Sequence, residues 1–327
     1  MAKIQFVAHI DDVPYGDSIL VSPLIRRVIA ENPSKYTYRG TGTYIVGNGD
    51  VAVIDPGPIL DSHRQALERA LVGSRVVAIV ITHCHSDHSP LAKWLHETTG
   101  APTYGVGPHS ASAPGDDDDD DDDEADEADE LGDDSALVGA PVEIREDIDR
   151  DFVPTRIVSD GDVIIDTGEF ALVAVATPGH TSNHMCVALP QERALFSGDH
   201  VMGWSTTVVS PPDGDMSSYI DSLKKVQLRD DAVIWPTHGG PISNPQIFLA
   251  QYLAHRLERE DQIVGCLRDG VSTIVEIVAQ LYSEVPKALH RAAGRSVLSH
   301  LIKLIEDDRV VVADGSKPRS KAVFALA

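Results

Sequence analysis

The motif HCHSDH, which begins at His83, places three histidines and one aspartate within six positions. Imidazole nitrogens and carboxylate oxygens are ligands that zinc and related divalent metals take from proteins. His83 and His85 are two residues apart, so on an extended backbone their side chains point the same way and can hold one ion. Asp87 and His88 follow past the bend and can face a second ion. Cys84 lies between the two histidines and should point the other way, as a packed thiol.

Three further candidate ligands each follow an apolar, strand-like run and adjoin a glycine: His180 in PGHTS, Asp199 in FSGDH and His238 in PTHGG. Glycine lets the backbone bend sharply and approach closely at such positions. Ligands at the ends of several strands of one sheet edge converge in space, although they are far apart in the sequence. Five histidines and two aspartates would then satisfy two divalent ions that share a bridging carboxylate. Nitrogen and oxygen ligands without a thiolate favour zinc, with manganese or iron as alternatives.

The elements that must position these side chains have recognisable signals. Residues 37–57 predict a hairpin, because two β-rich runs flank the turn signal NGD. The β-branched run VVAIVIT, which ends immediately before His83, predicts a strand buried on both faces. After the histidine cluster, Ser89 is expected to cap a helix whose first residue is Pro90.

The order of elements predicts the architecture. Residues 156–200 read as a run of short strands, with a helix and a further strand behind them. Mixed strands with helices between them predict an α/β fold in which two sheets are covered by helices. In residues 245–327, three helical patterns, the second capped by Ser272, precede a β-hairpin, which is typical of a small winged-helix-like module. We therefore expect a catalytic domain at 1–244 and a winged-helix-like domain at 245–327.

Much of the formal net charge of −24 lies in one segment. Residues 116–134 contain 15 acidic side chains and no basic ones, which leaves −9 for the rest of the chain. A block of like charges repels itself and buries no apolar area, so we expect a disordered acidic loop.

The cysteines and the apolar segments indicate in which cellular compartment the protein is expected. The three cysteines lie far apart and indicate no disulfide framework. The N-terminal residues lack a basic segment followed by an apolar stretch, and no apolar run reaches the length of a membrane span. We expect a cytoplasmic protein without a membrane partner, and the sequence leaves homo-oligomerisation open.

Taken in order, the HxHxDH motif, His180, Asp199, His238 and the stretch VIDPG resemble the metallo-β-lactamase superfamily, over roughly residues 38–242. The resemblance implies an αβ/βα sandwich that binds two metal ions. The chain departs from the family pattern after the motif, where SP stands in place of the usual glycines. This departure changes the start of the following helix and not the ligands.

The resemblance also assigns roles to the candidate ligands. It implies that one ion is held by three histidines: His83, His85 and His180. It implies that the second is held by one carboxylate and two histidines: Asp87, His88 and His238. Asp199 would bridge the two ions, and Asp55 in VIDPG would orient ligands or the loop beneath them.

This metal centre predicts a hydrolase. Two zinc ions would lower the pKa of a bound water from about 15.7 towards roughly 7, so that hydroxide is available at neutral pH. The hydroxide would attack an electrophilic carbonyl carbon or phosphorus. Asp87 would orient this nucleophile besides binding metal, and His184, four residues after His180, is the expected proton donor to the leaving group. His200 adjoins Asp199 and at most supports it.

The substrate is open between two classes. The stretches YLAHRLEREDQIV and GDHVMGW and the C-terminal module resemble the endoribonuclease-like subfamily of β-lactamase-like protein 2, which implies cleavage of single-stranded RNA. The acidic charge opposes RNA binding, which draws on contacts from Lys and Arg to phosphates. Six basic side chains near the C-terminus are a local counterweight, or serve only solubility: Arg291, Arg295, Lys303, Lys317, Arg319 and Lys321. The alternative substrates are small esters, thioesters, lactones or β-lactams. A non-catalytic binding protein is a third interpretation, which the complete ligand set disfavours.

Overall fold

The computed structural model of the chain describes residues 4–7, 14–109, 148–284 and 287–327. The acidic segment at 116–134, for which we expect a disordered loop, lies outside these residues. Within the described part of the chain, no helix has both the length and the apolar character needed to cross a lipid bilayer.

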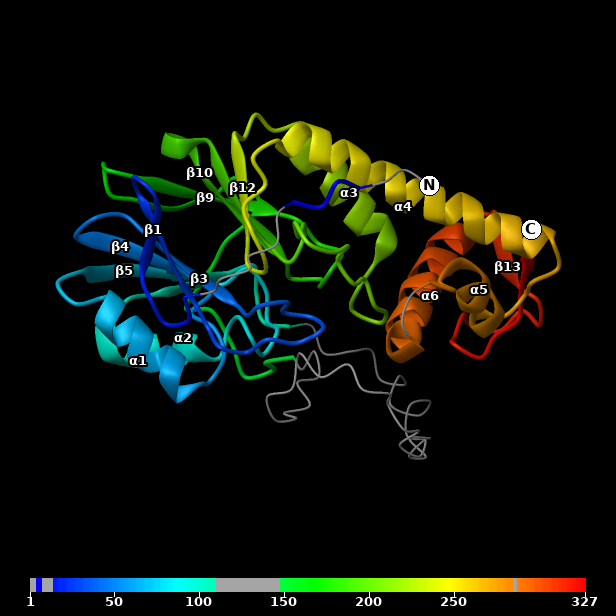
Figure 1. Cartoon of the computed structure of the whole chain (residues 1–327), viewed down its shortest axis with the longest axis horizontal. Helices are drawn as coiled ribbons and strands as arrows, with labels where there is room; N and C mark the ends of the chain where they lie inside the picture. The colour runs from blue at the N-terminus through cyan, green and yellow to red at the C-terminus, as the bar shows by residue number, and fades with distance from the viewer. Residues whose placement is uncertain (1–3, 8–13, 110–147, 285–286) are drawn as a thin grey trace.

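Two β-sheets face each other across the main apolar core (Figure 1). The first sheet has seven strands in sequence order: β1 (Ile19–Ser22), β2 (Ile25–Ile29), β3 (Gly42–Val46), β4 (Asp50–Ile54), β5 (Arg75–Val80), β6 (Thr103–Gly105) and β7 (Arg156–Ile157). Strands β1 to β4 pair antiparallel, and β4 to β7 pair in parallel. The second sheet, ordered β12-β11-β10-β9-β8, has five strands: β8 (Val163–Asp166), β9 (Ala171–Ala176), β10 (Met185–Leu189), β11 (Ala194–Gly198) and β12 (Val233–Pro236).

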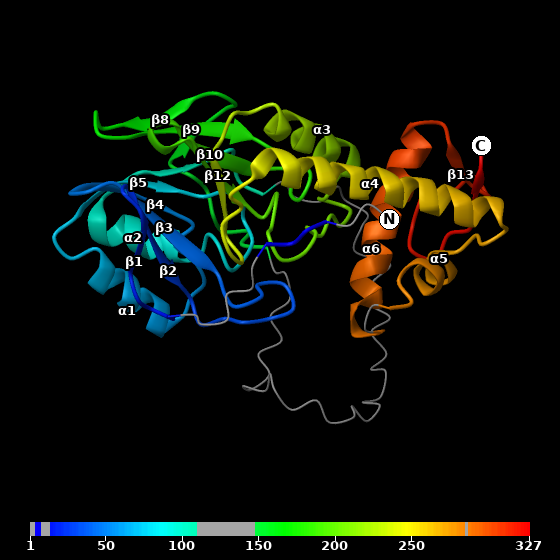
Figure 2. The same ribbon diagram turned by 45° about the horizontal axis from the view of Figure 1, so that its top comes forward.

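Helices cover the outer face of each sheet and complete a four-layer αβ/βα sandwich (Figure 2). Helices α1 (Asp61–Ala70) and α2 (Leu91–Thr99) pack on the first sheet through a second apolar cluster. Helix α3 (Met216–Gln227) and the first half of α4 (Pro245–Arg268) pack on the second sheet through a third cluster. The expected α/β sandwich is confirmed.

The expected hairpin at 37–57 is present as β3 and β4, and every residue of β3 is buried. A preceding hairpin, β1–β2, extends the same sheet and carries no clear sequence signal. Arg26 and Arg27 interrupt its apolar run, and the first two residues of β1 are exposed. Its pairing therefore depends on the neighbouring β3 and not on a local pattern.

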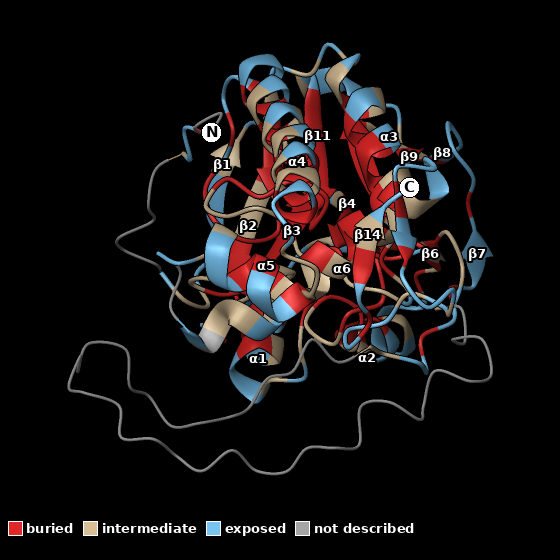
Figure 3. Ribbon diagram, turned by 90° about the vertical axis from the view of Figure 1, so that its right-hand side faces the viewer, coloured by how far each residue is buried: buried red, intermediate tan, exposed pale blue. Residues whose placement is uncertain are grey.

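The C-terminal part has its own apolar cluster, built from the second half of α4, two further helices and a hairpin (Figure 3). These elements are α5 (Ile274–Leu281), α6 (His290–Glu306), β13 (Val310–Val312) and β14 (Phe324–Leu326), with a short 3-10 turn (Lys287–Leu289) before α6. Helices followed by a two-stranded hairpin confirm the expected winged-helix-like module. The domain boundary at residue 244 stays a prediction, because α4 is one continuous helix that contacts α3 on one side and α5 and α6 on the other.

Two of the expected helix caps, Ser89 and Ser272, are wrong. The Ser89 hydroxyl donates to a carboxylate oxygen of Asp149 at 2.7 Å, and no side chain caps α2. Thr273 caps α5 in a reciprocal capping box with Glu276. The position of the glutamate decides the second case, because a capping box requires Glu or Gln three residues after the cap.

Candidate metal centre

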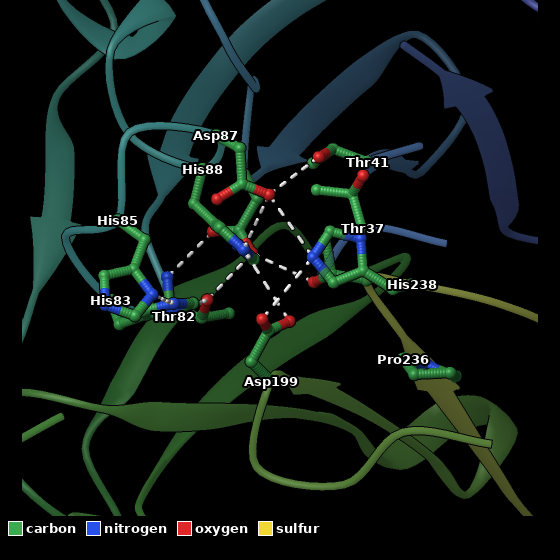
Figure 4. A network of polar contacts seen from close by, with 12 residues as sticks. Thr37, Thr41, Thr82, His83, His85, Asp87, His88, Asp199, Pro236 and His238 are labelled. Atoms are coloured by element: carbon green, nitrogen blue, oxygen red, sulfur yellow. Dashed lines mark hydrogen bonds and ion pairs between the residues drawn. The ribbon is translucent and has the colours of Figure 1, made fainter. Parts of the chain in front are cut away.

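The loops that follow four strands meet at one edge of the sandwich and carry the candidate ligands, all of which except His180 are labelled in Figure 4. The seven side chains follow β5, β9, β11 and β12 in that order: His83, His85, Asp87 and His88; His180; Asp199; and His238. Since β5 belongs to the first sheet and the others to the second, the ligands meet where the two sheets adjoin. All seven side chains are buried or partly buried.

One group consists of three imidazoles, those of His83, His85 and His180. The Nε2 atom of His83 lies 3.0 Å from the Nδ1 atom of His85. The Nε2 atom of His180 lies 3.2 Å from the same Nδ1 atom. Three nitrogens from two sheets therefore converge on one point, as a zinc site with three histidine ligands requires.

Two further groups overlap at His88: one adds Asp87 and His238, the other adds His83 and Asp199. The Nε2 atom of His238 lies 3.3 Å from Oδ2 of Asp87 and 3.4 Å from Oδ2 of Asp199. The other oxygen of Asp199, Oδ1, lies 3.6 Å from Nε2 of His88. The two oxygens of Asp199 thus face different members of the cluster, which is the placement that a bridging carboxylate needs.

Backbone carbonyls outside the cluster fix two of the rings. The Nδ1 atom of His180 donates to the carbonyl of Val208 at 2.7 Å, and Nδ1 of His238 donates to the carbonyl of Gly40 at 3.2 Å. A neutral imidazole that donates through Nδ1 has its lone pair on Nε2, so these hydrogen bonds make Nε2 the atom of each ring that a metal can take.

Asp55 lies beneath the cluster and is 1% exposed. Its carboxylate accepts hydrogen bonds from the backbone N–H and the hydroxyl of Thr82, each at 2.8 Å, and contacts Nδ1 of His88 at 2.9 Å. Because Thr82 immediately precedes His83, one carboxylate holds both the start of the ligand loop and the ring of His88. These are the contacts that an orienting role requires.

The electrostatics divide the cluster into two halves. Burial, reinforced by the neighbouring histidines, lowers the pKa of His83 far below its usual value and that of His85 to about 3. On the other side the carboxylates of the cluster overcome burial. They raise the pKa of His88 well above its usual value and that of His238 to about 10. Neutral imidazoles therefore face a region whose carboxylates favour a positive charge.

Two buried atoms of the cluster, Nε2 of His88 and Oδ1 of Asp199, have no hydrogen-bond partner. A buried polar atom left without a partner costs about 1–3 kcal/mol. A divalent cation between these atoms would satisfy both, and the surrounding donors are nitrogen and oxygen only. The residues present therefore fit a divalent metal centre.

His184 sits behind the cluster and is 1% exposed. Its Nδ1 atom contacts the Thr177 hydroxyl at 2.8 Å, and its Nε2 atom accepts from the backbone N–H of Asp199 at 3.3 Å. Burial lowers its pKa well below the usual value. With both ring nitrogens engaged, the side chain is better placed to hold the Asp199 loop than to donate a proton, and the donor role stays a prediction.

Two other neighbours of the ligands pack into the protein. The thiol of Cys84 accepts from the side-chain amide of Asn183 at 2.9 Å, and burial raises its pKa to about 11. The expected packed thiol is thereby confirmed. The His200 ring packs against Tyr219 with centroids 5.0 Å apart, and burial lowers its pKa to about 3.

A pocket opens on the cluster beside His180 and Asp199, and no sequence pattern indicates its walls. The other lining residues are mainly aromatic, apolar or hydroxyl-bearing, with one cation: Lys35, Tyr36, Met202, Trp204, Ser205, Thr206 and Val208. The Trp204 ring stacks on Tyr38, with centroids 4.9 Å apart and an interplanar angle of 18°. These residues come from two loops without periodicity, which is why the sequence does not reveal them.

Two family models match the chain. The metallo-beta-lactamase superfamily model matches residues 38–238, and the beta-lactamase associated winged helix domain model matches residues 273–317. A Caenorhabditis elegans protein named beta-lactamase-like protein 2 homolog is 30% identical over 294 residues, which cover 88% of this chain and 86% of the relative. An atrochrysone carboxyl ACP thioesterase from Aspergillus chevalieri is 28% identical over 310 residues, which cover 91% and 86%.

Solved structures share the whole arrangement. A beta-lactamase domain protein from Burkholderia ambifaria has a TM-score of 0.71 at 21% identity and covers 97% of this chain, with 96% of its own chain matched. A metallo-beta-lactamase family protein from Thermus thermophilus has a TM-score of 0.68 at 21% identity, and the match covers 94% of this chain and 100% of that chain. Because the coverage is nearly complete, the shared fold includes the C-terminal module.

Proposed function

This chain belongs to the metallo-β-lactamase superfamily of hydrolases, and from that premise we propose that it is a binuclear zinc hydrolase of small acyl thioesters or esters. One observation carries the proposal. Seven nitrogen and oxygen ligands converge, and the small pocket beside them is lined by aromatic, apolar and hydroxyl-bearing side chains with a single cation.

Zinc suits the donor set, and manganese or iron are the alternatives. The first ion would be held by three histidines: His83, His85 and His180. The second would be held by one carboxylate and two histidines: Asp87, His88 and His238. Asp199 would lie between them. When bound, two zinc ions would supply a water-derived nucleophile at neutral pH and polarise the substrate carbonyl.

Asp87 is the residue that we assign to orienting the attacking water. Its Oδ2 atom accepts from the Thr41 hydroxyl at 2.8 Å, which fixes the carboxylate. Although burial opposes ionisation, His88 and His238 hold the pKa of Asp87 well below its usual range. An ionised, fixed carboxylate can accept a hydrogen bond from the attacking water and so orient it.

The position of His184 favours a thioester, because a thiolate leaving group does not have to be protonated before it departs. His184, the expected proton donor, is buried with both ring nitrogens engaged. A thiol has a pKa of about 8.5, so a thiolate leaves near neutral pH without being protonated first. An alkoxide leaving from RNA or an alkyl ester is far more basic and needs a donor.

The side chains around the small pocket beside the cluster favour an acyl group with an apolar or aromatic body. Tyr36, Met202 and Trp204 offer apolar and aromatic surface to such a group, and Lys35 can pair with an anionic substituent. The Aspergillus chevalieri relative, which is named as an acyl-carrier-protein thioesterase, points to the same class of bond.

Single-stranded RNA is the second candidate, because the winged-helix module and the similarity to a beta-lactamase-like protein 2 homolog favour it. Part of the basic surface that RNA would use is engaged within the protein. Lys303 pairs with Glu260 and Asp307, and Arg295 donates to Ser210. We therefore rank RNA below small acyl substrates.

The test combines metal analysis with a substrate panel. Purified wild type and Asp87→Ala are compared on aryl and alkyl thioesters, an ester, a lactone, a β-lactam and labelled single-stranded RNA. We expect about two zinc ions per wild-type chain and thioester hydrolysis that falls by at least about a hundredfold in Asp87→Ala. RNA cleavage would weaken steeply between about 50 and 200 mM salt, whereas thioester hydrolysis would hardly respond. Cleavage of RNA alone would overturn the substrate proposal, and equal activity in Asp87→Ala would overturn the metal mechanism.

A further inference from the structure

The loop at residues 205–211, between β11 and α3, holds two candidate ligands from outside the cluster. The Val208 carbonyl accepts from Nδ1 of His180 at 2.7 Å. The Thr207 hydroxyl donates to the backbone carbonyl of Asp199 at 2.7 Å. Two adjacent loop residues thus fix the ring of His180 and the backbone of Asp199.

Two side chains of helix α4 hold this loop at Thr207, one through the backbone N–H of Thr207 and the other through its carbonyl. The hydroxyl of Tyr252 accepts from the Thr207 backbone N–H at 2.5 Å and lies 3.2 Å from the carbonyl of Ser205. Arg256, one turn further along α4, donates through Nη2 to the Thr207 carbonyl. The position of Thr207 is therefore set by side chains that sit far beyond the ligand motifs in the sequence.

Packing alone does not explain a guanidinium at position 256. Arg256 is 3% exposed, and its guanidinium lies over the rings of Tyr219 and Tyr252 at 5.0 and 5.8 Å from their centroids. No carboxylate among the described residues forms an ion pair with it. Burying a cation without a carboxylate costs free energy, and an apolar side chain of similar size often serves stability as well or better. The carbonyl of Thr207 is the acceptor that gives this charge a specific partner.

Helix α6 reaches the same loop further along. Arg295 donates through Nε to the Ser210 hydroxyl at 2.6 Å and through Nη2 to the Pro211 carbonyl at 3.3 Å. The 205–211 loop is therefore held by the first half of α4 at Thr207 and by α6 of the C-terminal module at Ser210 and Pro211.

We propose that Tyr252 and Arg256 are positioning residues for the metal centre, and that through them the first half of α4 is part of the scaffold of the site. The inference rests on the proposed metal binding at His180 and Asp199. Displacement of Thr207 would move the Val208 carbonyl, free the His180 ring to turn, and loosen the backbone at Asp199. Removing partners that orient metal ligands typically costs about 10- to 100-fold in metal affinity.

The test uses the full chain, three variants and zinc as the probe. Arg256→Met keeps the packing volume and removes the charge, and Tyr252→Phe removes only the hydroxyl. Glu260→Gln is the matched control, because Glu260 lies one turn further along α4 and faces His300, Lys303 and Arg309 instead of the loop. Zinc dissociation constants are measured by competition with a chromophoric chelator, and the Tm of the metal-free protein is measured alongside.

We expect Arg256→Met and Tyr252→Phe to raise the zinc Kd by about tenfold or more, with little change in the metal-free Tm. Glu260→Gln should lower the Tm and leave the Kd within about twofold of wild type. Wild-type zinc affinity in Tyr252→Phe and in a folded Arg256→Met would overturn the inference. The inference would also be overturned if zinc affinity and Tm fell together to the same extent in all three variants, because that result indicates a merely structural role. If Arg256→Met does not fold, Tyr252→Phe decides.

The zinc measurement needs no substrate, so the two proposals fail separately. A wild-type protein that binds two zinc ions but hydrolyses no thioester or ester would contradict the proposed substrate class. The comparison of zinc affinities between the variants would still decide the positioning role.

Discussion

Two clusters of buried charge in this chain are built in opposite ways. In the sandwich, Asp87 and Asp199 face imidazoles, and no Lys or Arg among the described residues pairs with either. In the C-terminal module, the carboxylate of Glu260 has Lys303 at 3.3 Å and Arg309 at 3.6 Å. The second cluster contains its own cations, whereas the first must obtain them from solution.

The difference separates a binding site from a scaffold. A buried carboxylate with protein cations around it has its charge balanced within the folded chain, and removing it leaves the charge of those cations less well compensated. A group of buried carboxylates and lone-pair nitrogens without such cations is satisfied only by bound metal or by protons. We therefore predict loss of function without loss of fold at the first cluster, and the reverse at the second.

The largest expected effect is at the shared carboxylate. Asp199→Ala should lower kcat/KM on an acyl thioester by about a thousandfold, or about 4 kcal/mol of transition-state stabilisation, because it removes a ligand next to both groups. Steady-state kinetics and zinc analysis measure this. Asp230→Ala, at a side chain 92% exposed, is the control and should match wild type. Full activity in Asp199→Ala would show that the cluster is not the catalytic centre.

The next effect concerns stability at the second cluster. Glu260→Ala should lower the free energy of unfolding by about 2–3 kcal/mol, because it removes the one buried carboxylate that Lys303, Arg309 and His300 share and leaves the two cations only their exposed partners. Denaturant unfolding measures the loss, and zinc content should not change. Asp261→Ala, at the exposed neighbour that also pairs with Arg309, should cost less than about 1 kcal/mol. Equal losses in the two variants would remove the distinction between the clusters.

A smaller effect is expected beneath the metal centre. Asp55→Asn should raise the zinc Kd by about 10- to 100-fold, because an amide has one acceptor oxygen and loses bonds to Thr82 or His88. Asp50→Asn, at the other end of β4 and paired with Arg75 on the surface, is the matched control. Indistinguishable zinc affinities would argue against an orienting role for Asp55.

The smallest effect is a pH dependence in the C-terminal module. Burial, opposed by Glu260, lowers the pKa of His300 to about 4. The unfolded chain binds this proton with a pKa of about 6.5, so stability falls as the pH drops from about 6.5 towards 4 and is flat above. Between about pH 7 and 5.5 this one group accounts for about 1 kcal/mol.

His300→Gln should remove that share of the slope in urea unfolding of the metal-free protein. A slope that matches wild type would mean that His300 is already protonated in the folded state.

The convergence of the candidate ligands is predictable because its signals are local. Each candidate ligand follows a strand-like apolar run, and HxHxDH concentrates four of them in one loop. Strand ends at one edge of a layered fold must lie close together, so the sequence also indicates that the distant His180, Asp199 and His238 join them. The two-sheet architecture follows from the same runs.

The supporting residues are not predictable because their signals depend on tertiary contacts. Tyr252 and Arg256 read as ordinary helix residues, and only the packing of α4 beside the 205–211 loop gives them partners. Lys35 and Trp204 lie in irregular loops that carry no periodicity. The proton-donor hypothesis for His184 depends on its spacing alone, which does not report that Thr177 and the Asp199 backbone occupy both ring nitrogens.

The most direct test of the proposed metal centre is a crystal structure of the zinc-loaded protein with anomalous data collected on both sides of the zinc absorption edge. We predict two zinc peaks. One is ligated by His83, His85 and His180, and the other by Asp87, His88 and His238, with Asp199 between them. Absence of zinc at this cluster in crystals grown with excess zinc, or zinc bound only elsewhere on the chain, would contradict the prediction.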